Sequence, residues 1–126
     1  IGRSLLTDHP LSFEACQNLT FMKINPRFQQ DTYPRNIQAS SGFRALAAEM
    51  GISTSGLAIA WLLAQGEHVL PIPGTRSVEH LNELAAGVDL VLSATDLAAI
   101  EAVLPIGWCH GDRYAHGQWR GPEKYC

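Results

Sequence analysis

Apolar residues recur at helical spacing in the middle of the chain, and this pattern predicts much of its secondary structure. The clearest stripe contains Phe43, Leu46, Ala47 and Met50. Intervals of three and four residues place side chains on one face of a helix, which we expect from about Arg35 to Met50. Gly51 then stands where a glycine commonly ends a helix.

The next predicted helix is apolar on almost every side. It is expected to begin after a cap at Ser53 or Thr54 and to end at Gln65, before Gly66. Because a helix without a polar face must be covered on most sides, we expect it inside a layered architecture, with Trp61 in the core. Its hydrophobic side chains are Leu57, Ile59, Trp61, Leu62 and Leu63.

The strand signal is confined to residues 68–73 (HVLPIP), a short apolar run typical of a strand buried on both faces. Its prolines limit it to a few paired residues. Two helices are predicted to follow, with caps at Ser77 and Ser93, and Ser93 forms an S-x-x-D capping pattern with Asp96. The extended segment 89–93 lies between them. We therefore expect one or two short strands in a mostly helical chain, and these strands need neighbours that the sequence hardly contains.

The two ends of the chain lack a clear period. A short helix is expected to begin at Ser12. The stretch NLTFMKINPRFQQDTYPRN after it, with Pro26 and Pro34, favours a long loop. The aromatic residues of the tail either cover a pocket or pack against the outside of the domain. They are Trp108, Tyr114, Trp119 and Tyr125.

The composition is that of one globular domain and argues against several function classes. Hydrophobic residues make up 46% and charged residues 17% of the 126 positions, and the net charge of −3 gives no basic surface for nucleic acid. The longest apolar run, GLAIAWLLAQG, is shorter than the about 20 residues that cross a bilayer. Three widely spaced cysteines favour a reducing compartment over a disulfide framework. Since no secretory signal pattern is present, we expect a cytoplasmic protein without nucleic-acid or membrane partners.

The segment PIPGTRSVEH, residues 71–80, places a glycine turn between the predicted strand and a helix. Such a junction directs backbone N–H groups and the positive end of a helix dipole towards one point, where a phosphate binds well. Arg76 adds a guanidinium that can pair with phosphate oxygens. Gly74 and Ser77 are equally typical of an ordinary turn and helix cap. The local pattern therefore leaves a phosphate cup and a plain connection both open.

The tail also carries residue types that bind metals. Cys109, His110, His116 and Cys126 follow a C-H-x5-H-x9-C spacing that matches no familiar metal motif. Structural zinc sites normally show tighter, paired spacings. We therefore expect no metal site, and a metal-binding tail is only a third alternative.

Longer stretches carry a more specific signal. LAIAWLLAQGEHVLPIPGTRSVEHLNEL, followed by VDLVLSATDLAAIEAVLP, resembles the C-terminal part of the aldo-keto reductase family. IGRSLL is similar to the segment after that family's seventh barrel strand, and NPRFQQDTYPRN to the long loop that follows in one subgroup. The resemblance covers residues 1–104 and extends through GDRY at 111–114.

This resemblance implies an α/β fold, with the chain forming the C-terminal fragment of a (β/α)8 TIM barrel. Residues 1–34 would be the loop region after strand seven, residues 35–104 the last helices and strand eight, and residues 105–126 the C-terminal tail. Because a complete barrel takes about 250 residues, the first half would be missing. The start at Ile1, without methionine, agrees with a chain from inside a longer protein.

The resemblance also implies an enzyme that uses NADPH or NADH to reduce aldehydes or ketones, with a small-molecule carbonyl compound as its substrate. Gly2 and Arg3 would contact the cofactor pyrophosphate, and Arg27 would strap the cofactor from above. Arg76 favours NADPH, and NADH is the alternative. The adenosine phosphate and adenine would be held by Gly74, Thr75, Arg76, His80 and Glu83.

Several departures from the family pattern limit this interpretation. Leu84 replaces the asparagine that follows Glu83 in the pattern, and Ser4 replaces a glycine. The motifs that carry the family's catalytic tyrosine, lysine, aspartate and histidine are absent, and Tyr33 and Lys23 lack the matching context. We therefore assign no catalytic residue and expect the chain alone to be inactive. The alternative is a non-catalytic helical interaction or nucleotide-binding module. In either case, exposed apolar faces predict self-association or a missing N-terminal half.

Overall fold

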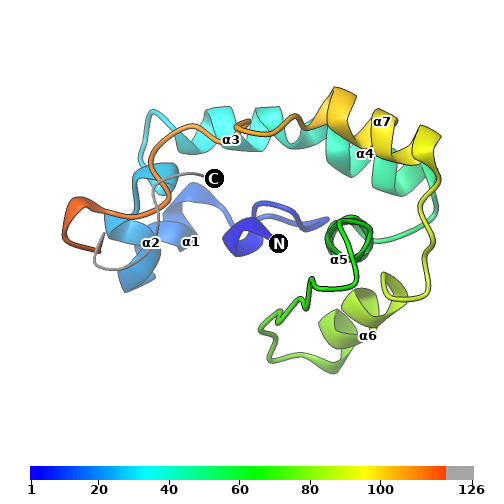
Figure 1. Cartoon of the computed structure of the whole chain (residues 1–126). Coiled ribbons are helices and arrows are strands. Elements are labelled where there is room, and N and C mark those ends of the chain that lie inside the picture. Colours follow the sequence, from blue (N-terminus) through cyan, green and yellow to red (C-terminus); the bar gives the residue numbers. More distant parts are fainter. Residues whose placement is uncertain (119–126) are drawn as a thin grey trace.

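A computed structural model describes residues 1–118, which fold into helices joined by turns and extended segments (Figure 1). The α-helices in this part are α1 (Phe13–Gln17), α2 (Thr20–Ile24), α3 (Tyr33–Ala39), α4 (Ser41–Glu49), α5 (Thr54–Leu63), α6 (Val78–Ala86) and α7 (Ala94–Val103). Short 3-10 turns are η1 (Gly2–Ser4), η2 (Pro26–Phe28) and η3 (His116–Gln118).

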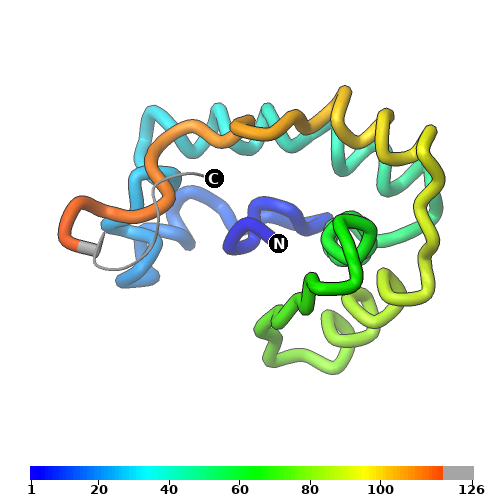
Figure 2. The backbone as a smooth tube through the Cα atoms, viewed as in Figure 1, coloured from blue at the N-terminus to red at the C-terminus, as the bar shows by residue number. Residues whose placement is uncertain are grey.

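The helices follow a curved path around the N-terminal segment (Figure 2). α3 and α4 run end to end, and α7 lies alongside α4. α5 packs against α4 and α6, whereas α1 and α2 pack together with η2 at the other end of the arch. The N-terminal residues therefore lie between two groups of helices.

The predicted serine caps are confirmed. The side chains of Ser12, Ser53, Ser77 and Ser93 each accept a hydrogen bond from the backbone N–H three residues ahead. These bonds satisfy N–H groups that have no partner inside the helix. Gly51 follows the end of α4 with a φ of +70°, the left-handed conformation that glycine adopts without strain.

The cap of α7 predicts a dependence of stability on pH. Asp96 Oδ2 accepts hydrogen bonds from the Ser93 hydroxyl and the Ser93 backbone N–H, which together lower the pKa of the Asp96 carboxyl below its usual value of 3.8. A lowered pKa stabilises the fold above the usual pKa, and this contribution disappears as the pH falls through the folded-state pKa. We expect the urea midpoint of the wild type to fall between pH 5 and pH 2 by more than that of Asp96→Asn, whereas Asp31→Asn, at an exposed site, should behave as wild type. Equal acid-side losses in Asp96→Asn and wild type would contradict this assignment.

The N-terminal third is more helical than predicted. The expected loop contains α2 and η2, and the Asn25 side chain caps η2 by accepting a hydrogen bond from Arg27 N at 3.0 Å. The single helix expected from Arg35 begins earlier, at Tyr33, and is divided into α3 and α4 at Ser40. The Ser40 hydroxyl donates to the Asn36 carbonyl at 2.8 Å, a local bond that competes with regular helix geometry.

The predicted strand is not confirmed. His68 lies in a turn, residues 69–73 belong to no helix or strand, and no strand occurs in the part of the chain that the structure describes. A strand requires a neighbouring strand as its hydrogen-bond partner, and residues 68–73 have none here. The side chains of Leu70 and Ile72 are consequently 83% and 94% exposed, and Val91, in the segment 89–93, is 90% exposed.

Two hydrophobic clusters hold the helices together. One joins α4, α5 and α7 through Phe43, Ala47, Leu57, Ala58 and Ile100. The other joins the N-terminal segment to α1, η2 and α3 through Leu5, Cys16, Phe28 and Tyr33. Each cluster covers apolar surface that would otherwise contact water, so the two groups of helices have separate cores.

The apolar helix α5 is only partly covered. Its residues from 54 to 60 are buried, as predicted. Trp61 packs against the first hydrophobic cluster but is only half-buried, because it also lines a cavity. Among the described residues, no single helix is long and apolar enough to cross a membrane; only α3–α4 and α5 taken together reach that length and composition, and they meet at 91°.

Candidate functional site

A cleft of about 770 Å³ lies between the N-terminal segment, α2 and the start of α6. One wall is the segment from Gly74 to Leu84, which contains Gly74, Thr75, Arg76, His80 and Glu83 of the predicted site. The opposite wall comes from residues 1–22, and Ser55 of α5 lies between them. The lining residues beyond the predicted set are Ile1, Ser4, Thr7, Asp8, His9, Leu11, Leu19, Met22, Ser55, Ser77 and Leu84.

The turn that leads into α6 is fixed by its own hydroxyl groups. Thr75 Oγ1 accepts a hydrogen bond from Ser77 N and donates to the Ser77 carbonyl, both at 3.2 Å. Ser77 Oγ in turn accepts from His80 N at 3.4 Å and caps the helix. This arrangement holds the N-terminus of α6 and the exposed Arg76 at the cleft, where a helix dipole and a guanidinium both favour an anion.

Glu83 is held in place from α5. Ser55 Oγ, on a residue that is 3% exposed, donates to Glu83 Oε2 at 3.2 Å, and Ser53 Oγ contacts the Glu83 carbonyl at 3.4 Å. Sequence reasoning missed Ser55. The only signal for it was the run of hydroxyl residues Ser53–Ser55 at the start of a helix. The Glu83 carboxylate is therefore fixed as a hydrogen-bond acceptor on the cleft wall.

Asp8 is a second residue of the cleft that the sequence did not indicate. Its Oδ1 accepts hydrogen bonds from Thr54 N at 2.9 Å and from Thr54 Oγ1 at 2.5 Å. Asp8 thereby occupies the N-terminus of α5, where a negative charge is favourable. This bond fastens the N-terminal segment to α5 and keeps the two walls of the cleft together.

The predicted residues Gly2, Arg3 and Arg27 do not line the cleft. Arg3 Nη1 donates to the Arg113 carbonyl at 2.8 Å, and Arg27 Nε donates to the Gly111 carbonyl at 3.2 Å. Both side chains are therefore engaged with the C-terminal segment. Their contact with a cofactor stays a prediction, and the sequence could not indicate the direction of their side chains.

The turn around Gly2 has unusual backbone geometry. Gly2, Arg3 and Ser4 all have positive φ, of 58°, 55° and 72°. Residues with a Cβ atom rarely adopt this region of φ, so the backbone at Arg3 and Ser4 is strained. Ser4 stands where the family pattern has a glycine, and a glycine would adopt this φ without strain.

The structure also shows the surroundings of Leu84 and Tyr33, two residues that were compared with the family pattern. Leu84 is 4% exposed and presents an apolar side chain where the family pattern has an amide. Tyr33 is buried against Cys16, its hydroxyl donates to the Leu11 carbonyl, and burial raises its pKa. Neither Tyr33 nor Lys23 lines the cleft.

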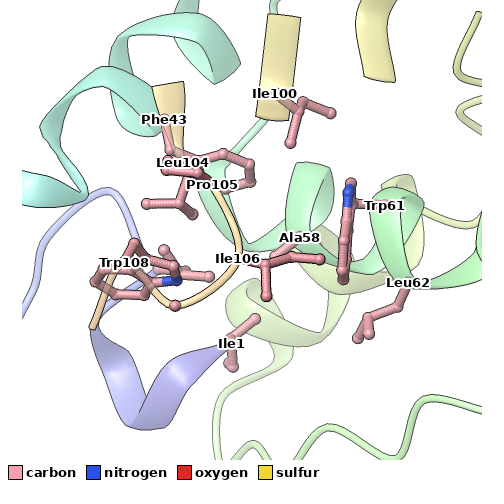
Figure 3. A pocket seen from close by; sticks show the side chains of 12 residues that line it. Ile1, Phe43, Ala58, Trp61, Leu62, Ile100, Leu104, Pro105, Ile106 and Trp108 are labelled. Atoms are coloured by element: carbon pink, nitrogen blue, oxygen red, sulfur yellow. The ribbon is translucent and has the colours of Figure 1, made fainter. Parts of the chain in front are cut away.

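A separate apolar cavity of about 270 Å³ lies beside α5 (Figure 3). Side chains from α4, α5 and α7 and from residues 104–108 face it, including Trp61 and Trp108, and Ile1 lies at its edge. Its lining carries no charged side chain. No group of three or more metal-binding side chains comes together within residues 1–118, and Cys126, Trp119 and Tyr125 lie outside the described residues.

Comparison with known proteins gives a family match. The model of the Aldo/keto reductase family matches residues 3–105, which include the whole Gly74–Leu84 wall of the cleft. The chain belongs to the aldo/keto reductase family. The resemblance inferred from the sequence is thus confirmed. Membership of the family implies a (β/α)8 barrel. The described part of this chain is helical, so it does not show the strands of such a barrel.

Two curated relatives illustrate how much of a family member is present. The aldo/keto reductase chain is 36% identical over 104 residues to the probable aldo-keto reductase 1 of Glycine max, covering 82% of this chain and 30% of that protein. It is 31% identical over 117 residues to the aldo-keto reductase yakc [NADP(+)] of Schizosaccharomyces pombe, covering 93% and 34%. The chain therefore spans about a third of the length of these relatives. No solved structure matches it.

Proposed function

We propose that this aldo/keto reductase chain supplies the adenosine-phosphate side of an NADP(H) site in an oxidoreductase that reduces aldehydes or ketones. The observation that carries the proposal is the capped turn before α6, which places Arg76 and the helix N-terminus on the cleft wall. The printed name of the Schizosaccharomyces pombe relative, which includes NADP(+), supports this choice of cofactor.

The residues present fit the phosphate end of such a cofactor. Arg76 would pair with the 2′-phosphate, Gly74 and Thr75 would offer backbone N–H groups, and Glu83 would accept a hydrogen bond. Leu84 offers only an apolar contact for the adenine. When bound, the cofactor supplies the hydride. The residues that would hold the carbonyl substrate and transfer its proton are proposed to lie in the part of the protein that precedes this chain.

The segment predicted as a strand, residues 68–73, fits the same proposal. We propose that residues 68–73 form the eighth barrel strand when the rest of the barrel is present, which would cover Leu70 and Ile72. Without that cover, these side chains favour self-association. A cytoplasmic location and a carbonyl substrate remain predictions.

Arg76→Gln tests the cofactor site. We expect it to weaken NADPH binding by roughly tenfold, because charge-assisted hydrogen bonds to the 2′-phosphate are lost, and to leave NADH binding nearly unchanged. Tryptophan fluorescence titrations of the 126-residue chain with both nucleotides measure this difference. Arg35→Gln, an exposed arginine of α3 outside the cleft, is the matched control.

Two results would overturn the proposal. One is equal NADPH affinity in wild type and Arg76→Gln, which would remove the phosphate role of Arg76. The other is NADPH-dependent carbonyl reduction by the purified 126-residue chain alone, which would place the catalytic residues inside it. Saturable NADPH binding without turnover is the expected result.

A further inference from the structure

Residues 109–114, here named the C-terminal strap, follow α7 and cross to the end of the molecule that holds α1 and α2 (Figure 1). Buried side chains hold the main chain of this strap. Asn36 Nδ2 donates to the His110 carbonyl at 3.0 Å, and Asn36 Oδ1 accepts from His110 N at 2.7 Å. Asn25 Nδ2 donates to the Arg113 carbonyl at 2.9 Å, and both asparagines are 0% exposed. The strap is therefore fixed in one position by its backbone.

The strap comes closest to the rest of the chain at Gly111. This glycine has a φ of +88°, and a Cβ atom there would lie 2.6 Å from the Pro26 carbonyl oxygen. Arg27 Nε donates to the Gly111 carbonyl at 3.2 Å, so the strap lies directly against η2. Gly107, which precedes the strap, also has a positive φ, of +82°, but a Cβ there would meet no atom within 4 Å. Docking of the strap therefore requires a residue without a side chain at Gly111.

The strap also holds Arg3. Arg3 Nη1 donates to the Arg113 carbonyl at 2.8 Å, and the guanidinium carbon lies 4.8 Å from the ring centre of Tyr114 in the strap. The same carbon lies 5.0 Å from the ring centre of Phe21 in α2. Contacts of this kind with aromatic rings favour a guanidinium. Among the described residues, the turn Gly2–Ser4 forms hydrogen bonds to other elements only through this arginine, and these bonds go to the strap.

The turn that Arg3 fastens is strained and borders the cleft. The φ angles of Arg3 and Ser4 are +55° and +72°, and Ser4 lines the cleft. A strained backbone persists only where its surroundings hold it in place. From Leu5 onwards other elements anchor the chain, because Arg44 Nη1 donates to the Leu5 carbonyl at 3.2 Å. The turn itself is held to other elements by Arg3, so its form depends on the docked strap.

We propose that the C-terminal strap is a latch for the N-terminal wall of the cleft. When the strap is docked, Arg3 is held and the turn Gly2–Ser4 keeps its left-handed form. When the strap opens, the turn relaxes and Ser4 leaves its place in the cleft wall. A ligand that contacts this wall therefore favours the docked strap, and the docked strap raises the affinity for that ligand by the same factor. The coupling of strap and turn is independent of the ligand, and only its extension to NADPH rests on the proposed function.

Amide hydrogen exchange of the 126-residue chain tests the coupling of strap and turn. Gly111→Ala places a Cβ against the Pro26 carbonyl and releases the strap, whereas Gly107→Ala is the matched control with a similar φ and open space. In Gly111→Ala we expect the His110 amide to exchange at least roughly tenfold faster than in the control. The amides of Leu5 and Leu6, which donate across the turn, should accelerate by the same factor, and α5 and α6 should keep wild-type rates.

Two outcomes of the exchange experiment overturn the proposal. One is loss of protection at His110 with unchanged exchange at Leu5 and Leu6, which would show that the turn keeps its form without the strap. The other is retained protection of His110 in both Gly111→Ala and Asn36→Leu. In that case the strap has no open state to which the turn could be coupled.

Calorimetric titration with NADPH tests the effect on the cleft. Neither Gly107 nor Gly111 lines the cleft, yet we expect Gly111→Ala to bind NADPH roughly fivefold more weakly than Gly107→Ala. Saturating NADPH should slow exchange of the wild-type His110 amide by the same factor. Equal NADPH affinities in the two variants would refute the link between strap and cleft. If the wild type binds no NADPH, the proposed function fails, and the exchange experiment still decides whether strap and turn are coupled.

Discussion

Gly87→Ala is expected to lower the free energy of unfolding by about 3 kcal/mol, because it forces a side chain into the contact between α5 and α6. A Cβ atom at Gly87 would lie 2.2 Å from the Gly56 carbonyl oxygen, and one at Gly56 would lie 2.9 Å from the Glu83 carbonyl oxygen. Both obstacles are backbone atoms, so no side-chain rotation can relieve the overlap. Separation of α5 from α6 would also move Glu83 away from Ser55 in the cleft.

Urea unfolding monitored by circular dichroism measures this loss. Gly74→Ala is the matched control, because a Cβ there meets no atom within 4 Å and its φ is not positive. We expect the control to be within about 0.5 kcal/mol of wild type, as is usual for surface substitutions. A Gly87→Ala protein as stable as Gly74→Ala would show that α5 and α6 are not in the close contact described here.

The parts of the fold that the sequence predicted are those decided within a few residues. The side chains of Ser53, Ser77 and Ser93 cap their helices by accepting a hydrogen bond from the backbone N–H three positions ahead. Both partners of each bond therefore lie in one short stretch of sequence. The predicted strand at residues 68–73 could not be decided in this way, because a strand depends on hydrogen-bond partners that nearby residues do not supply. Trp61 packs against the core but is only half-buried for a related reason: an apolar side chain is fully buried only if other elements cover it on every side.

The candidate site shows the same division. Gly74 to Glu83 is one continuous segment, so its residues could be grouped from the sequence before the cleft was known. Asp8 bonds to Thr54, 46 positions away, and no local pattern predicts such a contact. Arg3 and Arg113 meet across 110 positions. Resemblance to a family can assign an arginine to a segment, but only tertiary packing decides which neighbour it contacts.

The second large effect on stability is expected from the buried Asn36, which holds residues 109–114, the C-terminal strap, by hydrogen bonds to the main chain of His110. Asn36→Leu keeps the volume of the side chain but removes its hydrogen bonds to the Arg27 and His110 carbonyls and to His110 N. Buried polar groups left without a partner each cost about 1–3 kcal/mol, so we expect a total loss of about 3 kcal/mol after partial access of water to the strap. Urea unfolding measures the loss in stability.

Hydrogen exchange at the His110 amide shows whether the strap itself is released by Asn36→Leu. In the wild type, this N–H is protected by its 2.7 Å bond to Asn36 Oδ1, and the variant should exchange it at the rate of a locally open segment. Gln38→Leu, an exposed position on the same helix, adds a leucine without removing a buried bond and should keep His110 protected. Retained protection in Asn36→Leu would mean that Asn25, Arg3 and Arg27 hold the strap without Asn36. Loss of protection together with unchanged exchange in α5 and α6 would identify the strap as a unit that opens independently of these two helices.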